Sequence, residues 1–284
     1  MGEGGRIPPA PKAESHPQPR HNGRVATRDV LGIAENRPNG ARALAAAALV
    51  VLLAVAVAAA WPVSDADSAP ARVVILGKTS STPSPSCPGK TVNGQPVVSC
   101  KVEGHVSGFQ AVASGVPRPL EAPFDGKIVA WSITLSKPSH EDTDTTSDEI
   151  GFFDDFLGKP SEARIGILRP VEGSKPPQYT LVRQSPPQIL NSYFGSTVVF
   201  ALDHPLTILR GQTVALTVPT WAPMFAFNVS VEDTWRGSRK PEHCASREDI
   251  QGGHPQQGVG KTKTYGCYYS QARLLYTATL VKQP

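Results

Sequence analysis

The sequence predicts an all-β fold: a jelly-roll-like β-sandwich over residues 96–284, preceded by a disordered N-terminal tail and one transmembrane helix. Three observations predict it. Short segments in which apolar and polar residues alternate recur along the second half of the chain. Turn residues separate these segments at regular spacing, and the one long apolar run precedes them all. About nine short strands with no long helix among them are typical of a sandwich, and we expect a jelly roll rather than an immunoglobulin-like topology.

Residues 1–42 are predicted to be a disordered cytoplasmic tail. They hold six prolines and few large aliphatic residues, so they cannot bury enough apolar surface to offset the conformational entropy of the chain. The tail carries seven Lys and Arg against four Asp and Glu, which leaves 21 and 20 for the rest. Residues 43–284 are therefore close to neutral and lack the basic face that nucleic-acid binding needs, so we expect no nucleic-acid partner.

Residues 43–63 are predicted to be a transmembrane signal anchor. Nineteen consecutive residues from Ala43 carry no polar or charged side chain, and as a helix they would span about 28 Å, close to a hydrocarbon core. Basic residues precede this run and acidic residues follow it, which predicts a cytoplasmic N-terminus and an extracellular C-terminal domain in the cell membrane. The alternative is a cleaved signal peptide, which would release the same outer domain as a secreted protein.

Residues 64–95 form a Ser/Thr/Pro-rich spacer with one short strand at 72–77. The clearest later strand is 126–136, where large apolar residues alternate with small or polar ones, so Trp131 is expected in the core. The other expected strands are 163–169, 179–183, 196–202, 206–211, 213–218, 225–231, 264–269 and 272–281, with turns at 123–126, 203–205 and 210–212.

Residues 140–158 form an acidic insertion between two predicted strands. Calcium takes carboxylate oxygens in irregular loops, which makes Asp142, Asp144, Asp148 and Glu149 weak calcium candidates. The spacing of a calcium-binding loop is absent, so a solvated acidic loop is the main interpretation. Phenylalanines at helical spacing later in the insertion predict a short helix that covers an open edge or end of the sheet, with an exposed partner or membrane contact as the alternative.

Four cysteines, all after the apolar run, indicate an oxidising compartment. Of the three pairings, we expect the local one, Cys87 with Cys100 and Cys244 with Cys267, because it closes the shortest loops. A zinc site is the alternative, although the chain has no C-x-x-C motif.

Aromatic residues in predicted loops are candidates for a glycan platform: Trp221, Trp235, Tyr193 and Tyr268. The alternative is that these rings close the core with their polar atoms satisfied at its rim. Residues 233–263 form a long polar loop with several basic side chains, which the second disulfide would tether, and anionic wall polymers are a candidate ligand for it. The sequence contains no recognisable catalytic motif and no glycine-rich phosphate loop, so we expect no catalytic residues and no cofactor.

Several segments together resemble a group of uncharacterised, membrane-anchored or secreted envelope proteins of actinobacteria. The resemblance covers most of residues 73–284 and implies an envelope location and a β-sandwich outer domain, without functional residues. The segments are LGKT (76–79), PSCP (85–88), GFQ (108–110), DGKIVAWSITLS (125–136), ARIGILRP (163–170), LRGQTVALTVPTWAP (209–223) and YGCYYSQARLLY (265–276).

The sequence therefore predicts a membrane-anchored outer module that binds wall polymer, glycan or an envelope protein without catalysis. Two alternatives stay open. One is a hydrolase acting on envelope polysaccharide, whose two carboxylates need only meet in space. The other is a membrane-linked sensor that signals through residues 1–42.

Overall fold

The computed structural model describes residues 72–87, 91–92, 95–96, 100–140 and 148–283. The chain divides into two compact units, Met1–Ala66 and Asp67–Pro284, and every described residue belongs to the second. The predicted tail at 1–42, the predicted transmembrane helix at 43–63 and the start of the spacer therefore lie outside the described residues. Within the described residues, no helix is long and apolar enough to cross a membrane.

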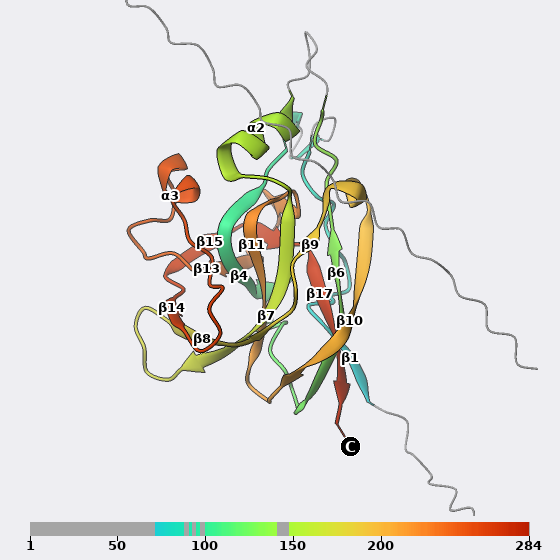
Figure 1. The fold of residues 1–284 in the computed structure, drawn as a ribbon, viewed down its shortest axis with the longest axis vertical. Coiled ribbons are helices and arrows are strands. Elements are labelled where there is room, and N and C mark those ends of the chain that lie inside the picture. The colour runs from blue at the N-terminus through green and yellow to red at the C-terminus, as the bar shows by residue number, and fades with distance from the viewer. Residues whose placement is uncertain (1–71, 88–90, 93–94, 97–99, 141–147, 284) are drawn as a thin grey trace, which may run out of the picture. The chain divides into compact units, whose positions relative to one another are not determined.

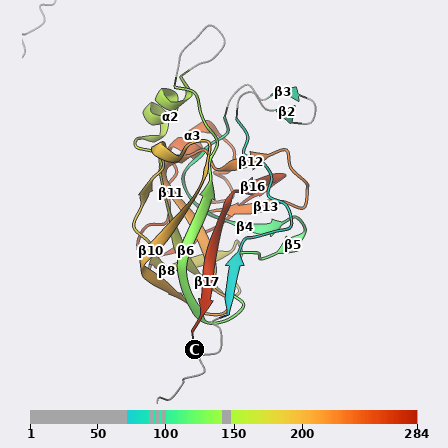
Figure 2. The same ribbon diagram turned by 90° about the vertical axis from the view of Figure 1, so that its right-hand side faces the viewer.

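Two antiparallel sheets build the second unit (Figure 1). The smaller sheet has four strands in the order β1-β17-β6-β10, and Figure 2 looks onto it. Its strands are β1 (Val73–Leu76), β17 (Tyr276–Lys282), β6 (Gly126–Thr134) and β10 (Thr197–Ile208).

The larger sheet has nine strands, seven of them in the order β14-β8-β7-β11-β4-β13-β15. Two short strands branch from this path, since β5 pairs with β4 and β9 pairs with β7. The nine are β14 (Thr262–Thr264), β8 (Gln178–Gln184), β7 (Glu162–Val171), β11 (Thr213–Ala222), β4 (Glu103–Ala113), β13 (Thr234–Gly237), β15 (Cys267–Ser270), β5 (Val116–Pro117) and β9 (Gln188–Ile189).

Two further strand pairs and three short helices complete the described elements. The pairs are β12 (Phe225–Phe227) with β16 (Ala272–Leu274), and β2 (Thr91–Val92) with β3 (Gln95–Pro96). The helices are α2 (Glu149–Leu157), α3 (Arg247–Gln251) and the 3₁₀ helix η1 (Asn191–Tyr193). The prediction of an all-β domain is confirmed.

Both sheets contribute to one hydrophobic core. On β6, Ile128, Trp131 and Ile133 are completely buried, and they belong to the same cluster as Ile167 of β7 and Leu216 of β11. Trp131 and Ile133 follow the alternation that predicts the strand at 126–136, whereas Ile128 reaches the core because the pairing with β17 shifts register between Ile128 and Ala130. The prediction that Trp131 is a core residue is confirmed.

Several observed strands differ from the predicted ones: 225–231 is a strand only over Phe225–Phe227, and the predicted strands 264–269 and 272–281 are each divided between two strands. Two further differences concern the sheets directly. The segments 196–202 and 206–211 were expected as separate strands, but residues 197–208 form the single strand β10 with a register shift between Ala201 and Leu206. Pro205 lies within that shift and is tolerated because β10 is an edge strand. Alternation does not predict the central strand β4, because this strand is buried along most of its length and its side chains do not alternate between apolar and polar.

The nine-stranded sheet curls until its two edge strands come near each other. β14 ends at Thr264 and β15 begins at Cys267, so at most about 11 Å separates these two α-carbons across three peptide units. Backbone hydrogen bonds hold the connection on both sides: Tyr265 N donates to Pro177 O at 2.8 Å, and Gly266 N donates to Arg239 O at 2.8 Å. We call this junction between the two edges the seam.

Aromatic side chains fill the inside of the curled sheet at the seam. The rings of Phe109, Tyr179 and Tyr265 contact one another with centroids 5.0 to 5.7 Å apart. Tyr265 is completely buried, and its hydroxyl donates to Gln256 Oε1 at 2.7 Å. An aromatic cluster thus fills the inside of the seam, and the hydroxyl of its completely buried member, Tyr265, has a hydrogen-bond partner.

Candidate functional site

Both expected disulfides are present. Cys87 is bonded to Cys100, and Cys244 is bonded to Cys267. The chain has no free cysteine, so the zinc alternative, which requires thiolate ligands, is wrong.

The two tryptophans expected in a glycan platform are core residues. Trp221 is completely buried between Phe153 and Phe194, with ring centroids 5.1 and 5.4 Å away, and its Nε1 donates to Asp154 Oδ1 at 2.9 Å. Trp235 is also completely buried and stacks on Tyr269 at 4.3 Å. Neither indole offers a free face. Trp221 fits the alternative interpretation, in which a ring closes the core with its polar atom satisfied, whereas Trp235 fits only its first part, because no hydrogen-bond partner for its buried Nε1 is found among the described residues.

The two tyrosines of the expected platform are exposed, but they lie in different elements, one in the helix η1 and the other on strand β15. Tyr193 of η1 is 38% exposed and contacts Phe200 of the four-stranded sheet. Tyr268 is 52% exposed on β15 of the nine-stranded sheet, where the guanidinium of Arg236 lies 4.8 Å from its ring. The four aromatic residues therefore form no common platform.

The two described calcium candidates have structural roles. Asp148 caps α2, since its Oδ1 accepts from Gly151 N at 2.8 Å. Glu149 is buried, and its two oxygens accept from Cys100 N at 2.6 Å and Ser139 N at 3.0 Å. Asp142 and Asp144 lie outside the described residues. Within the part of the chain that the structure describes, no group of three or more His, Cys, Asp or Glu side chains is placed to hold a metal ion.

Helix α2 lies over an apolar cluster, as the aromatic spacing of the insertion predicted. Phe153 and Leu157 are buried together with Trp221 and the Cys87–Cys100 disulfide. The outer ring, Phe152, stacks on Phe156 at 5.7 Å, and the Arg247 guanidinium from α3 lies about 5 Å from both rings. Helix α2 therefore covers this apolar cluster.

A pocket of about 610 Å³ opens beside the second disulfide, and we call it the staple pocket. Three pieces of the chain form it: the segment after β13, helix α3 with the residues that follow it, and the edge strand β14. It therefore lies at the seam of the curled sheet. Its lining residues are Ser238, Arg239, Lys240, His243, Glu248, Asp249, Gly252, Gly253, His254, Thr262, Lys263 and Thr264.

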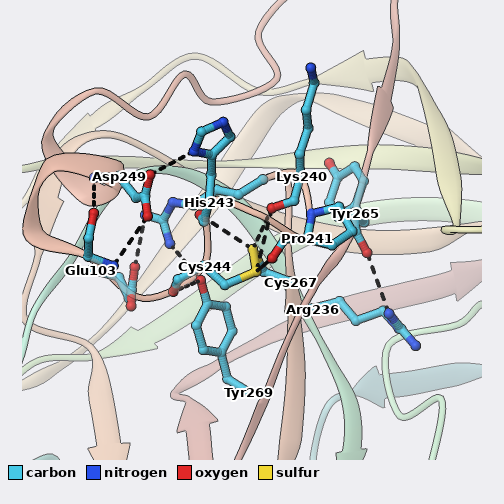
Figure 3. The surroundings of a disulfide bond; sticks show 12 residues. Glu103, Arg236, Lys240, Pro241, His243, Cys244, Asp249, Tyr265, Cys267 and Tyr269 are labelled. Atoms are coloured by element: carbon cyan, nitrogen blue, oxygen red, sulfur yellow. Dashed lines mark hydrogen bonds and ion pairs between the residues drawn. A yellow bond between two sulfur atoms is a disulfide. The ribbon is translucent and has the colours of Figure 1, made fainter.

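Short-range contacts fix helix α3 at the rim of the staple pocket. Ser246 and Asp249 form a capping box, in which Asp249 N donates to Ser246 Oγ at 3.0 Å and Ser246 N donates to Asp249 Oδ2 at 3.2 Å. The other oxygen of Asp249 lies 2.8 Å from His243 Nδ1 (Figure 3). The Cys244–Cys267 disulfide joins the same loop to β15. One wall of the pocket is thus held by a cross-link and a capped helix.

The histidine of β4 ties the same rim to the packed end. The ring nitrogens of His105 lie 2.6 Å from Gln251 O, at the end of α3, and 2.8 Å from Leu157 O, at the end of α2. The rim of the pocket is thereby coupled to the helix that covers the apolar cluster.

A buried ion pair forms the base of the staple pocket. Arg239 is 5% exposed, and its Nη2 lies 3.3 Å from Glu103 Oε2 and donates to Gly104 O at 2.8 Å. Its Nη1 donates to the Tyr269 hydroxyl at 3.0 Å. Burial raises the pKa of Glu103, and the Arg239 guanidinium opposes that shift. The charge of Arg239 is therefore matched from within the protein.

Lys263 is the second cation in the interior of the staple pocket. It lies on β14 opposite Tyr179 and is partly buried. Burial, together with the nearby Arg239 guanidinium, lowers the pKa of Lys263. Among the described residues, no carboxylate forms an ion pair with it and no hydrogen bond reaches its ammonium. The pocket therefore presents a half-buried positive charge that the fold does not neutralise.

The sequence shows that the loop at 233–263 is polar and basic, but it does not show which of its basic side chains are buried or paired. Arg239, Lys240 and Lys263 are equivalent in a charge count, whereas the structure pairs the first, exposes the second and half-buries the third. The one local signal is the TKT segment, in which Lys263 stands between two threonines with strand-like alternation next to Tyr265.

No protein-family model matches this chain, and neither a curated protein nor a solved structure matches it.

Proposed function

We propose that this chain is a membrane-anchored, extracytoplasmic binding module that holds a polar polymer of the cell envelope in the staple pocket. The single observation that carries this proposal is the pocket itself. It is about 610 Å³, its lining residues include hydroxyl, imidazole and charged side chains, and a disulfide and a capped helix hold its rim. Rigidly framed concave sites with a few convergent polar groups are where ligands bind.

The outer location in this proposal rests on the apolar run at 43–63, the two disulfides and the resemblance to envelope proteins of actinobacteria. The two sheets around one core support a jelly-roll-like arrangement of the outer domain. Binding to an envelope protein is the other form of the same proposal, and the pocket favours a polymer, because it is concave rather than flat and several charged side chains line it.

The staple pocket favours binding over hydrolysis. A glycosidase needs one carboxyl group to act as acid and a second to act as nucleophile or base. The pocket contains Glu248 and Asp249, but both oxygens of Asp249 are engaged, one with His243 and the other with the Ser246 amide. That carboxylate stabilises the rim and is not available to a sugar. The sensor alternative depends on residues 1–42, which lie outside the described residues.

A sedimentation assay with purified cell-wall sacculi tests the proposal. The full-length chain, purified in non-ionic detergent, should co-sediment with sacculi, and Thr264→Trp, which fills the staple pocket from β14, should abolish co-sedimentation. The matched control is Thr279→Trp on β17 of the four-stranded sheet, which should leave it unchanged. No co-sedimentation of the parent chain, or equal co-sedimentation of both variants, would refute the proposal.

A further inference from the structure

The charges that line the staple pocket fall into two groups. Asp249 is used by the capping box and by His243, and Arg239 is paired with Glu103. Lys240 and Glu248 are exposed, so water screens their charges. Lys263 belongs to neither group, since it is partly buried and has no counter-ion among the residues that the structure describes.

An unpaired ammonium in a half-buried place opposes folding. Removing a charge from water is unfavourable unless an opposite charge or hydrogen bonds replace the water. Position 263 lies on the edge strand β14, in register with Tyr179 of β8, and a neutral side chain would keep the same backbone pairing. The positive charge of Lys263 therefore does not stabilise the fold. We take this as an indication that the charge binds a ligand.

The surroundings of Lys263 suit a negatively charged group. Thr264 brings a hydroxyl group to the pocket, and the exposed Lys240 and His254 line its rim. Hydrogen bonds between an ammonium and an anionic oxygen are among the stronger ones in proteins, because both partners contribute charge. The low local dielectric that makes the unpaired lysine unfavourable also strengthens its attraction to an anion.

We propose that Lys263 is the anion-recognition residue of the staple pocket, and that the polymer bound there carries negatively charged groups, either phosphate diesters or carboxylates. This inference rests on the proposed function, which by itself requires only a polar polymer. Arg239 is not assigned to anion recognition, because its charge is matched by the buried Glu103. Lys240 adds long-range attraction that salt screens.

Calorimetric titration of the full-length chain in non-ionic detergent tests the inference. The probes are a short polyphosphate, an oligogalacturonate and a maltohexaose, which differ in charge but are all polar. We expect binding of at least one of the two anionic probes, weaker binding as salt rises, and no binding of maltohexaose.

Lys263→Met should reduce the affinity for the bound anion at least tenfold, whereas the matched variant Lys282→Met, at an exposed lysine on β17, should change it less than twofold. Thermal unfolding of both variants shows whether they are folded, and Lys263→Arg keeps the charge and should retain binding. Equal affinity of the parent chain and Lys263→Met for the anion would overturn the inference.

Two other outcomes separate this inference from the proposed function. Co-sedimentation with sacculi together with binding of maltohexaose alone would refute anion recognition and leave the polymer-binding function standing. No co-sedimentation and no binding of any probe would refute both. Binding of polyphosphate alone identifies a phosphate-bearing polymer, and binding of oligogalacturonate alone identifies a carboxylate-bearing one.

Discussion

The two disulfides of this protein lie in regions that differ in how their polar groups are satisfied. Cys87–Cys100 belongs to an apolar cluster with Trp221, Phe153 and Leu157, whereas Cys244–Cys267 joins β15 to the loop whose Lys240 and His243 line the staple pocket. An acid or a base that is at least partly buried lies near each disulfide. Near the first, Glu149 has both oxygens bound by backbone amides, and near the second, Lys263 has no partner among the described residues. A cross-link by itself is therefore no sign of function, and the satisfaction of nearby polar groups distinguishes the two regions.

The largest effect is expected from a substitution in the apolar cluster around Cys87–Cys100. Trp221→Ala should lower the free energy of unfolding by about 3–5 kcal/mol, because it removes a large side chain from a site that cannot collapse completely. Urea denaturation followed by circular dichroism measures the change. Tyr268→Ala, at an exposed ring, is the control and should change stability by less than about 1 kcal/mol. Similar losses for both substitutions would contradict the assignment of Trp221 to the core.

Removal of each disulfide separates stability from binding. The paired cysteines are 13 and 23 residues apart, so each double Cys→Ser variant should lose about 3 kcal/mol on the chain-entropy model. Thermal unfolding at matched protein concentration compares the two losses. Co-sedimentation with sacculi should fall only for Cys244→Ser/Cys267→Ser, since that bridge holds the wall of the staple pocket. Loss of co-sedimentation in both variants at a temperature where both are folded would remove the contrast.

Glu149→Gln tests whether the carboxylate near the first disulfide serves only to bind the backbone amides of Cys100 and Ser139. Glutamine keeps one acceptor oxygen, and its NH₂ group then faces one of the two amides that the carboxylate accepts from. We expect a loss of about 1–3 kcal/mol in denaturant titrations, with affinity for anionic probes unchanged. Asp148→Asn is the neighbouring control, because asparagine caps helices about as well as aspartate and should cost only a few tenths of a kcal/mol. A drop in anion affinity for Glu149→Gln would show that the two regions are not separate.

The smallest expected effect is that of Lys263→Met on the free energy of unfolding. Unlike the substitutions above, it should stabilise the protein. The pKa of Lys263 is lowered by burial and by Arg239, so the folded chain holds this proton less well than the unfolded chain does. The wild-type lysine therefore destabilises the fold at neutral pH, and its penalty fades as pH rises toward the ordinary lysine value of about 10.4. Lys263→Met should be more stable than the parent by about 0.5 kcal/mol at pH 7.

Chemical denaturation at pH 7 and pH 10 measures this difference, which should shrink at the higher pH. Lys282→Met, at an exposed lysine, should show no such gain at either pH. A loss of stability in Lys263→Met at pH 7 would mean that the ammonium supports the fold rather than a ligand.

Local patterns in the sequence were sufficient for much of the fold. Strand β6 is predicted from the alternation of Val129, Trp131, Ile133 and Leu135 with small or polar residues, and Trp131, Ile133 and Leu135 are indeed buried. Only the structure shows the register shift that buries Ile128 in place of Val129. Helix α2 followed from the spacing of its phenylalanines, and both disulfides followed from the shortest loops. Each of these depends on neighbours within about 25 residues, so the chain encodes it locally.

The candidate site, by contrast, depends on contacts between residues far apart in the chain. Trp221 and Trp235 appeared in turn-like sequence, and only the packing of α2 on one and of Tyr269 on the other decided that both are buried. The pocket exists because the nine-stranded sheet curls until β14 and β15 meet, which no pattern of period two specifies. Burial then gave the basic residues of one loop different roles: Arg239 is neutralised by Glu103, 136 positions earlier, while Lys263 is left for a ligand. Sequence sets which charges are present, and tertiary structure decides which of them remain unpaired, because only folding removes some from water.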